Sequence, residues 1–283
     1  MKWGLYAGLL VAGFVGLSLF SFWLAVRPPR LTIPFTPADF RLAVEDVTIR
    51  AADGARLAGW LVAKPGAPAI VLLHGYPADK ADMLPLAAAL ARRFTVLLVD
   101  LRYFGHSEGR ATTLGLRERD DLSRAIDLLA TRGFDRVGVF GFSLGGAIAI
   151  MTAADDRRIR ALAAYSPFAD LRTLAHGLYA WTGPLRYPFV GLMLTWSRIF
   201  LGADVTASSP VAAAARLSVP VYLIASRDDE QIPFSHAERL REALAANPRA
   251  EYEFMDTGRH GMMAPGVEGR IERFFARALE GGS

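Results

Sequence analysis

The 283-residue sequence contains no cysteine, and this absence excludes several classes of protein. Disulfide scaffolds, cysteine-ligated zinc, iron–sulfur clusters and cysteine nucleophiles all need thiols. Lysine is also scarce, because only Lys2, Lys64 and Lys80 occur and arginine carries the remaining positive charge. The arginines are dispersed and form no basic stripe with interleaved aromatics, which is the pattern typical of nucleic-acid binding. We therefore expect no nucleic-acid partner.

The longest uncharged stretch lies at the N-terminus. Residues 4–26 are 23 consecutive residues without a charge. As a helix this run is about 34 Å long, against about 30 Å for a hydrocarbon core. A cleaved signal peptide is the alternative, but its apolar region is usually about 7–15 residues and closes on a small-x-small site. The pattern predicts an uncleaved membrane anchor over residues 1–30, in a single-pass protein of a bacterial inner membrane.

The flanks of this stretch carry nearly balanced charge, with Lys2 on one side and Arg27, Arg30 and Arg41 on the other. The positive-inside rule therefore leaves the side of the membrane that holds the remaining chain undecided. The segment that follows, residues 31–43, bears prolines and predicts a linker. We expect this linker to isolate the anchor from the core of the domain.

Residues 44–283 alternate between apolar runs and segments with helical periodicity. With 52% hydrophobic and 21% charged residues, this chain can bury a core. Such alternation predicts an α/β domain with a mostly parallel sheet of about eight strands and helices on both faces. The expected strands are residues 47–50, 57–62, 69–73, 94–99, 137–140, 159–164, 219–225 and 252–255, and the expected helices are 83–93, 116–131, 144–154, 236–245 and 267–279.

One stretch interrupts this alternation. Residues 178–202 are rich in Trp, Tyr, Phe and Leu and are broken by Gly183-Pro184 and Pro188. Ordinary core packing is one explanation for such residues. Because apolar insertions often roof the pockets of such folds, we predict a cap of one or two short helices within an insertion at about 170–210.

The strongest local motif is the run from Gly141 to Gly146, which reads G-F-S-L-G-G. It follows an expected strand and opens an expected helix, as a nucleophilic serine on a strained turn does. Gly141 and Gly145 provide room for that turn, so Ser143 is the candidate nucleophile. A glycine-rich phosphate-binding turn is the alternative, but neither G-x-G-x-x-G nor a Walker lysine is present.

A serine nucleophile needs a general base and an orienting carboxylate. His260 follows the last expected strand, and Asp228 and Asp229 follow the strand before it. This chain order of serine, acid and histidine is the one found with G-x-S-x-G motifs. Because side chains alternate along an extended segment, only one of the two aspartates faces His260.

The reaction also needs donors for a developing oxyanion. We expect the backbone N–H of Leu144, at the start of the helix, and the N–H of Tyr76, in the loop after the third strand. Gly75 lets that loop approach the serine. We interpret His74 as a structural residue that holds the loop, and no metal-ligand spacing accompanies it, so no metal is expected.

Taken together, these pieces resemble the α/β-hydrolase superfamily, within its serine-aminopeptidase-like group of acyl hydrolases. The matching motifs are His74-Gly75-Tyr76-Pro77, residues 100–109, Gly141 to Gly146, Asp229-Glu230-Gln231-Ile232-Pro233 and His260-Gly261, in family order. The resemblance implies an α/β-hydrolase fold over residues 44–283. It also implies that Asp229 is the acid, because the family places it four residues before a proline.

The sequence departs from this family at two positions. Ser226 and Arg259 stand where the family often has glycine, and the larger Arg259 side chain stands next to His260. In the family, residues 100–109 usually pack beneath the site. We expect a structural role for them here, with Tyr103 and His106 as candidates to line the pocket.

The resulting hypothesis is a membrane-anchored serine hydrolase that forms an acyl-enzyme intermediate and needs no cofactor. It would cleave esters, or thioesters or amides, of a small-molecule or lipid-like acyl substrate, as carboxylesterases and lipases do; peptide cleavage is less favoured. An acyltransferase or perhydrolase using the same triad is one alternative. A non-catalytic membrane scaffold with a hydrolase fold is another. The fold alone does not choose between them.

Overall fold

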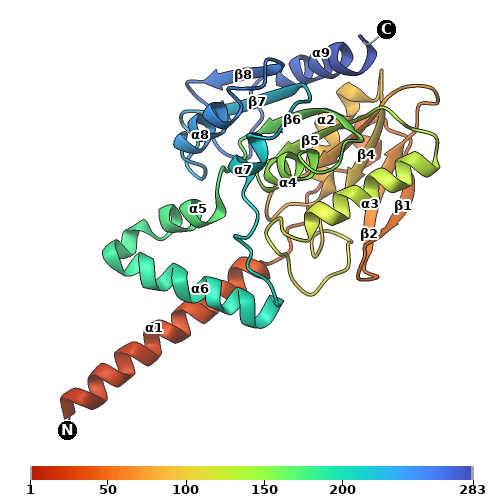
Figure 1. Ribbon diagram of the computed structural model, residues 1–283. Helices are drawn as coiled ribbons and strands as arrows, with labels where there is room; N and C mark the ends of the chain where they lie inside the picture. Colours follow the sequence, from red (N-terminus) through yellow and green to blue (C-terminus); the bar gives the residue numbers. More distant parts are fainter. Residues whose placement is uncertain (1, 282–283) are drawn as a thin grey trace.

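The computed structural model of the chain describes residues 2–281. Its centre is one eight-stranded sheet in the order β1-β2-β4-β3-β5-β6-β7-β8 (Figure 1). The strands β1–β2 and β2–β4 pair antiparallel, and all other neighbours pair parallel. This confirms the predicted mostly parallel sheet. The strands are β1 Glu45–Arg50, β2 Arg56–Val62, β3 Ala69–Leu73, β4 Thr95–Val99, β5 Val137–Phe142, β6 Ile159–Tyr165, β7 Val221–Ser226 and β8 Ala250–Met255.

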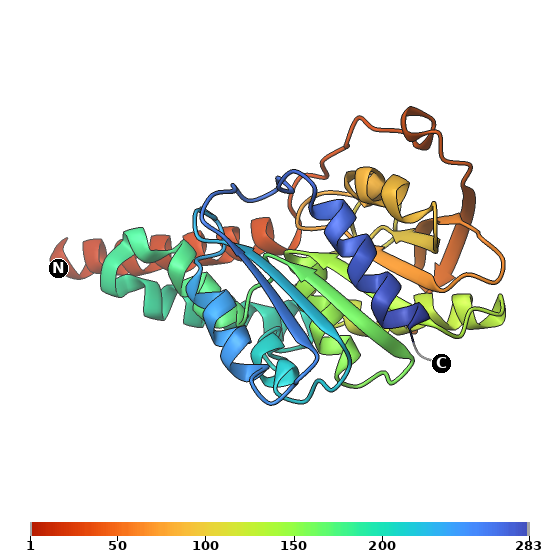
Figure 2. The same cartoon turned by 90° about the horizontal axis from the view of Figure 1, so that it is seen from above.

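Helices cover both faces of this sheet (Figure 2). The helices α2 (Leu84–Leu90) and α9 (Val267–Glu280) lie on one face. The other face carries α3 (Glu118–Thr131), α4 (Leu144–Ala153), α7 (Pro210–Ala214) and α8 (Ser235–Ala243). Because both faces are covered, the central strands are buried throughout, as their continuous apolar runs predicted.

The alternation of side chains in β3 separates two hydrophobic layers. Val71 and Leu73 pack in the layer beneath α3 and α4, whereas Ile70 and Leu72 pack in the layer beneath α2 and α9. This double burial fixes the register of the central strands, since a one-residue slip would exchange the two layers. The loops at the carboxyl ends of β3, β5, β7 and β8 are thereby held in fixed positions.

The cap lies outside the sheet, between β6 and α7 (Figure 1). It consists of α5 (Leu171–Leu178), the 3-10 helix η3 (Ala180–Leu185) and α6 (Arg186–Leu201). The predicted break at Pro188 does not occur, because this proline lies in the first turn of α6. Backbone N–H groups in the first turn make no hydrogen bond within the helix, so proline, which lacks this group, is tolerated there. The cap therefore contains one long helix where short ones were expected.

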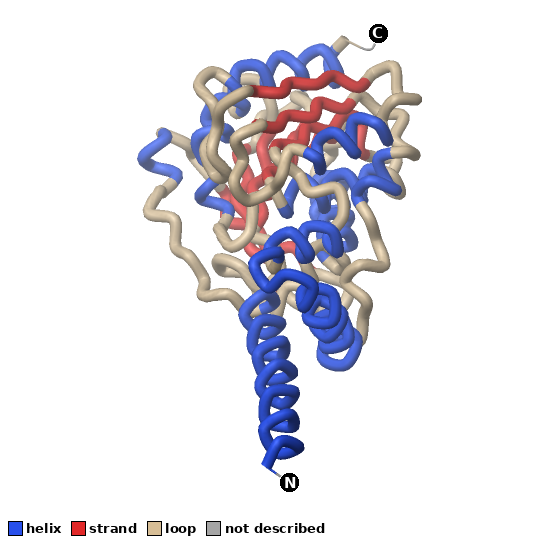
Figure 3. The backbone as a smooth tube through the Cα atoms, turned by 90° about the vertical axis from the view of Figure 1, so that its left-hand side faces the viewer, coloured by secondary structure: helices blue, strands red, loops and turns tan. Residues whose placement is uncertain are grey.

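The N-terminal helix α1 (Lys2–Val26) projects from the domain beside the cap (Figure 3). It is long and apolar enough to cross a membrane, by length and composition. A proline-bearing segment with one 3-10 helix, η1 (Pro37–Phe40), then leads to β1. The short 3-10 helix η2 (Lys80–Met83) precedes α2.

The sequence predicted that the linker isolates α1 from the core of the domain, but α1 packs against the cap. The carboxyl-terminal half of α1 packs along α6, and Ser18, Phe22 and Val26, spaced four residues apart, are buried there. The backbone carbonyl of Val26 also accepts a hydrogen bond from the N–H of Thr112, at 3.0 Å. The linker begins after this docked half of α1. It therefore does not separate α1 from the cap.

Candidate active site

Ser143 occupies a sharp turn between β5 and α4. Its backbone angles are φ 50° and ψ −113°, in a region that residues with a side chain rarely adopt. The turn closes so tightly that a Cβ on Gly141 would lie 2.2 Å from the carbonyl oxygen of Gly145. A Cβ on Gly145 would lie 2.5 Å from the carbonyl oxygen of Leu73. Both glycines are therefore required, and the hydroxyl of Ser143 projects at the carboxyl edge of the sheet.

Neighbouring strands bring a second loop against this turn. In the parallel pair of β3 and β5, Leu73 lies opposite Gly141, so the residues after each strand meet. A Cβ on Gly75 would lie 2.7 Å from the Phe142 ring and 3.3 Å from the Ser143 Cβ. Only glycine permits this approach, as the sequence indicated.

The side chains of Ser143, His260 and Asp229, from three different loops, form a continuous chain of contacts. The Nε2 atom of His260 lies 3.0 Å from the Ser143 Oγ, and its Nδ1 lies 2.8 Å from the Asp229 Oδ2. The ring of Phe142 packs against the imidazole with their centroids 5.0 Å apart. The histidine can therefore accept a proton on one nitrogen while the carboxylate holds a proton on the other.

The environment of Asp229 favours its ionised form. Burial alone would raise the pKa of this carboxyl group, but hydrogen bonds from His260 and from the N–H groups of Ile232 and Gln231 outweigh burial and lower the pKa below its usual range. Asp228, in contrast, is exposed. Of the two adjacent aspartates, the structure therefore brings Asp229 to the histidine.

Two backbone N–H groups belong to residues next to the serine turn. Tyr76 directly follows Gly75, which approaches Ser143, and Leu144 is the first residue of α4. Within residues 2–281, neither N–H makes a hydrogen bond to another part of the chain. The positive end of the α4 dipole adds to the attraction that both groups would exert on an oxyanion.

His74 is fully buried and both of its ring nitrogens have backbone partners. Its Nε2 accepts a hydrogen bond from the N–H of Leu101 at 3.0 Å, so its Nδ1–H donates to the carbonyl of Gly75 at 2.8 Å. Burial lowers the pKa of His74, which keeps the ring neutral. The residue ties the β3 loop to the loop after β4, a geometry that suits a structural role.

A buried ion pair that the sequence did not indicate lies beneath these loops. Lys80 Nζ is 2.6 Å from the Asp100 Oδ2, and both side chains are almost fully buried. The same carboxylate accepts hydrogen bonds from the N–H groups of Lys80 and His106. Twenty residues separate the two charges in the chain, and nothing in the local sequence distinguishes this lysine from an exposed one.

Tyr103 and His106 do not line the cavity beside Ser143, contrary to expectation. The hydroxyl of Tyr103 donates to the carbonyl of Pro28 at 2.8 Å, and the His106 ring is exposed. Arg259 also avoids the site, because its side chain points to solvent near Glu230. The departure from glycine at this position therefore leaves His260 free to contact Ser143.

An apolar cavity of about 340 Å³ begins at Ser143 and extends beneath the cap. Its walls come from α5, α6, the loops of the sheet and, unexpectedly, α1. The lining residues include Phe22, Ala25 and Val26 of α1, Leu171, Leu174 and Leu178 of α5, and Val190, Met193 and Leu194 of α6. Gln231 is its main polar side chain besides Ser143. Within the described residues, no group of three histidine, aspartate or glutamate side chains is placed to hold a metal.

Comparisons with known proteins agree with this architecture. The sequence model described as the alpha/beta hydrolase fold matches residues 68–202. The Escherichia coli (strain K12) protein YfhR is 32% identical over 220 residues, which cover 73% of this chain and 70% of that protein. The alpha/beta hydrolase domain-containing protein WAV2 of Arabidopsis thaliana is 27% identical over 90% of this chain and 86% of its own.

Among solved structures, an esterase of Pyrococcus furiosus, Pf2001, superposes with a TM-score of 0.74 at 28% identity. The match covers 90% of this chain and 98% of the esterase. With the eight-stranded sheet, the strained serine turn and these relatives in agreement, the chain belongs to the α/β-hydrolase superfamily.

Proposed function

We propose that this protein is a membrane-anchored serine hydrolase that cleaves carboxylic esters. The observation that carries the proposal is the chain of contacts from Ser143 through His260 to Asp229, at 3.0 and 2.8 Å. A serine hydroxyl becomes an effective nucleophile when an oriented imidazole removes its proton. A hydrolase with this arrangement also agrees with the esterase among its structural neighbours.

In the first half of the reaction, the Ser143 Oγ attacks the ester carbonyl carbon and His260 Nε2 takes the serine proton. The N–H groups of Tyr76 and Leu144 stabilise the resulting oxyanion, and Asp229 stabilises the imidazolium. As the intermediate collapses, the carbon–oxygen bond to the alcohol breaks. His260 gives its proton to the departing alcohol, and the acyl group remains on Ser143.

In the second half, a water molecule gives a proton to His260 and attacks the acyl-enzyme. The bond to the Ser143 Oγ then breaks, the serine regains the proton, and a carboxylic acid leaves. Every proton transfer uses a side chain of this protein, so the reaction needs no cofactor. Esters suit this site better than amides because an alcohol leaves more readily than an amine.

Covalent labelling tests this proposal directly. A fluorophosphonate probe should label the full-length protein in detergent, and Ser143→Ala should remove the label. Product analysis with p-nitrophenyl esters and an added alcohol then separates hydrolysis from acyl transfer, because a transferase would yield the new ester. A protein that neither reacts with the probe nor cleaves any ester is a scaffold, and the proposal fails.

A further inference from the structure

The part of α1 that is free of the cap is too short to cross a bilayer. Residues 2–13 of α1 are exposed, and the first partly buried side chain is that of Phe14. Twelve helical residues rise about 18 Å, against about 30 Å for a hydrocarbon core, and tilting shortens the span further. If α1 crosses the membrane, about 12 Å of its docked half also lies at hydrocarbon depth.

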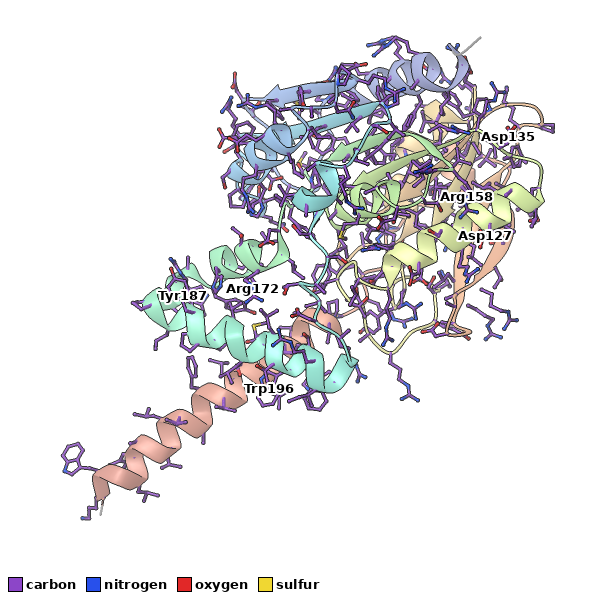
Figure 4. All side chains as sticks on the ribbon, in the orientation of Figure 1. Asp127, Asp135, Arg158, Arg172, Tyr187 and Trp196 are labelled. Atoms are coloured by element: carbon purple, nitrogen blue, oxygen red, sulfur yellow. The ribbon has the colours of Figure 1, made fainter. Side chains whose placement is uncertain are left out.

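The helix α6 accompanies α1 through this depth. Phe14 contacts Phe189 edge-on at 5.5 Å, near the start of α6, and the Trp196 Nε1–H donates to the Ser18 Oγ at 3.0 Å. Both helices run in the same direction, toward the domain, so the start of α6 lies farthest from the sheet. Figure 4 shows Trp196 between the two helices and Tyr187 at the outer end of the cap.

This outer end, the cap tip, presents large apolar side chains to the surroundings. Trp181 is 76% exposed, Leu185 58%, Tyr187 57% and Leu178 57%. An exposed apolar patch of this kind marks a binding surface. The same end of α6 contacts α1 through Phe189 and Phe14, next to the exposed half of α1. Tryptophan and tyrosine are the side chains that favour the boundary between headgroups and hydrocarbon.

The charge of the cap also suits a lipid surface. No aspartate or glutamate occurs between Asp170 and Asp204, a segment that contains Arg172, Arg186 and Arg198. The Nε of Arg186 is buried and has no hydrogen-bond partner among the described residues. Arg198 is paired with Asp204, whereas Arg172 and Arg186 have no carboxylate partner among the described residues. Unpaired positive charge of this kind is attracted to anionic lipid headgroups.

The cavity and the cap tip share one residue. Leu178 lines the cavity together with Ser143 and is also exposed at the cap tip. Ala25 and Val26 of α1 form part of the wall. A chain that enters beside Leu178 would therefore move from the surroundings of α1 to the serine past mainly apolar side chains.

We infer that the cap tip is embedded in the leaflet from which α1 emerges, and that the cavity takes the acyl chain of an amphiphile from that leaflet. The substrate part of this inference rests on the proposed ester hydrolysis. The embedding part rests on the geometry of α1 and α6 and on α1 crossing the membrane. In this inference α1 has two roles: it anchors the protein in the membrane, and it forms part of the wall of the acyl site.

The depth of the cap tip can be measured without any assay of activity. Because the chain has no cysteine, Trp181→Cys and Tyr187→Cys each provide one labelling site for an environment-sensitive fluorophore. The labelled full-length proteins are reconstituted in vesicles of phosphatidylcholine and phosphatidylglycerol. Leu9→Cys, in the free half of α1, serves as the membrane reference, and Tyr252→Cys, exposed on β8, as the aqueous reference.

We expect doxyl-labelled lipids to quench both cap labels several-fold more strongly than the label at position 252, and iodide to quench them less. Cap labels that behave like position 252, while position 9 is quenched by lipid, overturn the embedding of the cap. A position 9 label that also behaves like position 252 overturns the crossing of α1, and the inference fails with it.

The acyl site has a matched pair of variants on α1. Ala25 faces the cavity, whereas Leu24 beside it is exposed and does not line it. Ala25→Trp should lower the ratio of dodecanoate to acetate hydrolysis at least tenfold, and Leu24→Trp should leave this ratio unchanged. An unchanged ratio in Ala25→Trp would show that α1 does not line the acyl site. A wild-type protein that cleaves neither ester and binds no fluorophosphonate refutes the proposed function instead, and leaves the depth measurements standing.

Discussion

The loops at the carboxyl edge of the sheet and the cap with α1 are held together by different forces. At the sheet edge, polar side chains have specified partners, such as Lys80 with Asp100 and His260 with Asp229. The cap meets α1 mainly through aromatic and aliphatic contacts, for example between Trp23 and Phe200, at 5.3 Å. Directional hydrogen bonds fix atoms closely, whereas apolar contacts tolerate sliding. Under the proposed function, the chemistry would belong to the first region and substrate capture to the second.

The largest effect should follow from the serine itself. Ser143→Ala removes the proposed nucleophile but little packing, so we expect turnover of an activated ester to fall by about 10⁵–10⁶, by analogy with triad knockouts in known serine hydrolases. Near-normal thermal unfolding should show that the sheet edge keeps its structure. Wild-type turnover by the purified variant would place the chemistry elsewhere.

The next effect separates two adjacent carboxylates. Asp229→Asn should reduce turnover by about 10⁴, because an amide favours the wrong histidine tautomer. Asp228→Asn should reduce it by less than about tenfold, since this exposed residue lies outside the proton-transfer chain. Both variants should be assayed at neutral pH on one ester. If Asp228→Asn instead shows the large loss of turnover, this result would contradict the role inferred from the contact between Asp229 and His260.

A pair of truncations tests the apolar region. Deleting residues 2–13 removes only the free half of α1 and should leave ester hydrolysis in detergent nearly unchanged. Deleting residues 2–26 also removes Phe22, Ala25 and Val26 from the cavity wall. The loss of contact with two or three methylene groups, at about 0.8 kcal/mol each, should slow long-chain hydrolysis by about tenfold to a hundredfold. Equal activity of the two truncations would show that the wall is not used.

The smallest effect concerns pH. Burial, reinforced by the charge of Asp79, raises the pKa of Asp82 in η2 to about 6. The folded protein therefore retains this proton between about pH 4 and 6 while the unfolded chain loses it, so stability falls as the pH rises through this window. Asp82→Asn should raise Tm by a few degrees more at pH 7 than at pH 4. Asp135→Asn, exposed at the opposite end of the sheet, is the control (Figure 4).

The sheet was predictable from sequence because its central strands are short apolar runs bounded by turn residues. The candidate nucleophile was predictable because the serine turn needs glycines at fixed spacing, as Gly141 and Gly145 show. The contribution of α1 to the cavity wall was not predictable from sequence. The helix is apolar on every side, so no apolar face distinguishes Phe22 or Ala25 from the other residues of α1. Their role depends on where α6 lies, which is set by tertiary packing alone.

The backbone conformation of Ser143 implies a trade-off between the proposed activity and stability. At φ 50° and ψ −113°, a residue with a Cβ is strained by about 1–3 kcal/mol, whereas glycine adopts this region readily. The residue that we expect to be most stable at this position is therefore one that would abolish the proposed reaction. Ser143→Gly should unfold at a higher temperature than both Ser143→Ala and the wild type. If Ser143 is the nucleophile that we propose, selection for thermostability alone would favour its loss, so a search for stable variants must screen for turnover as well.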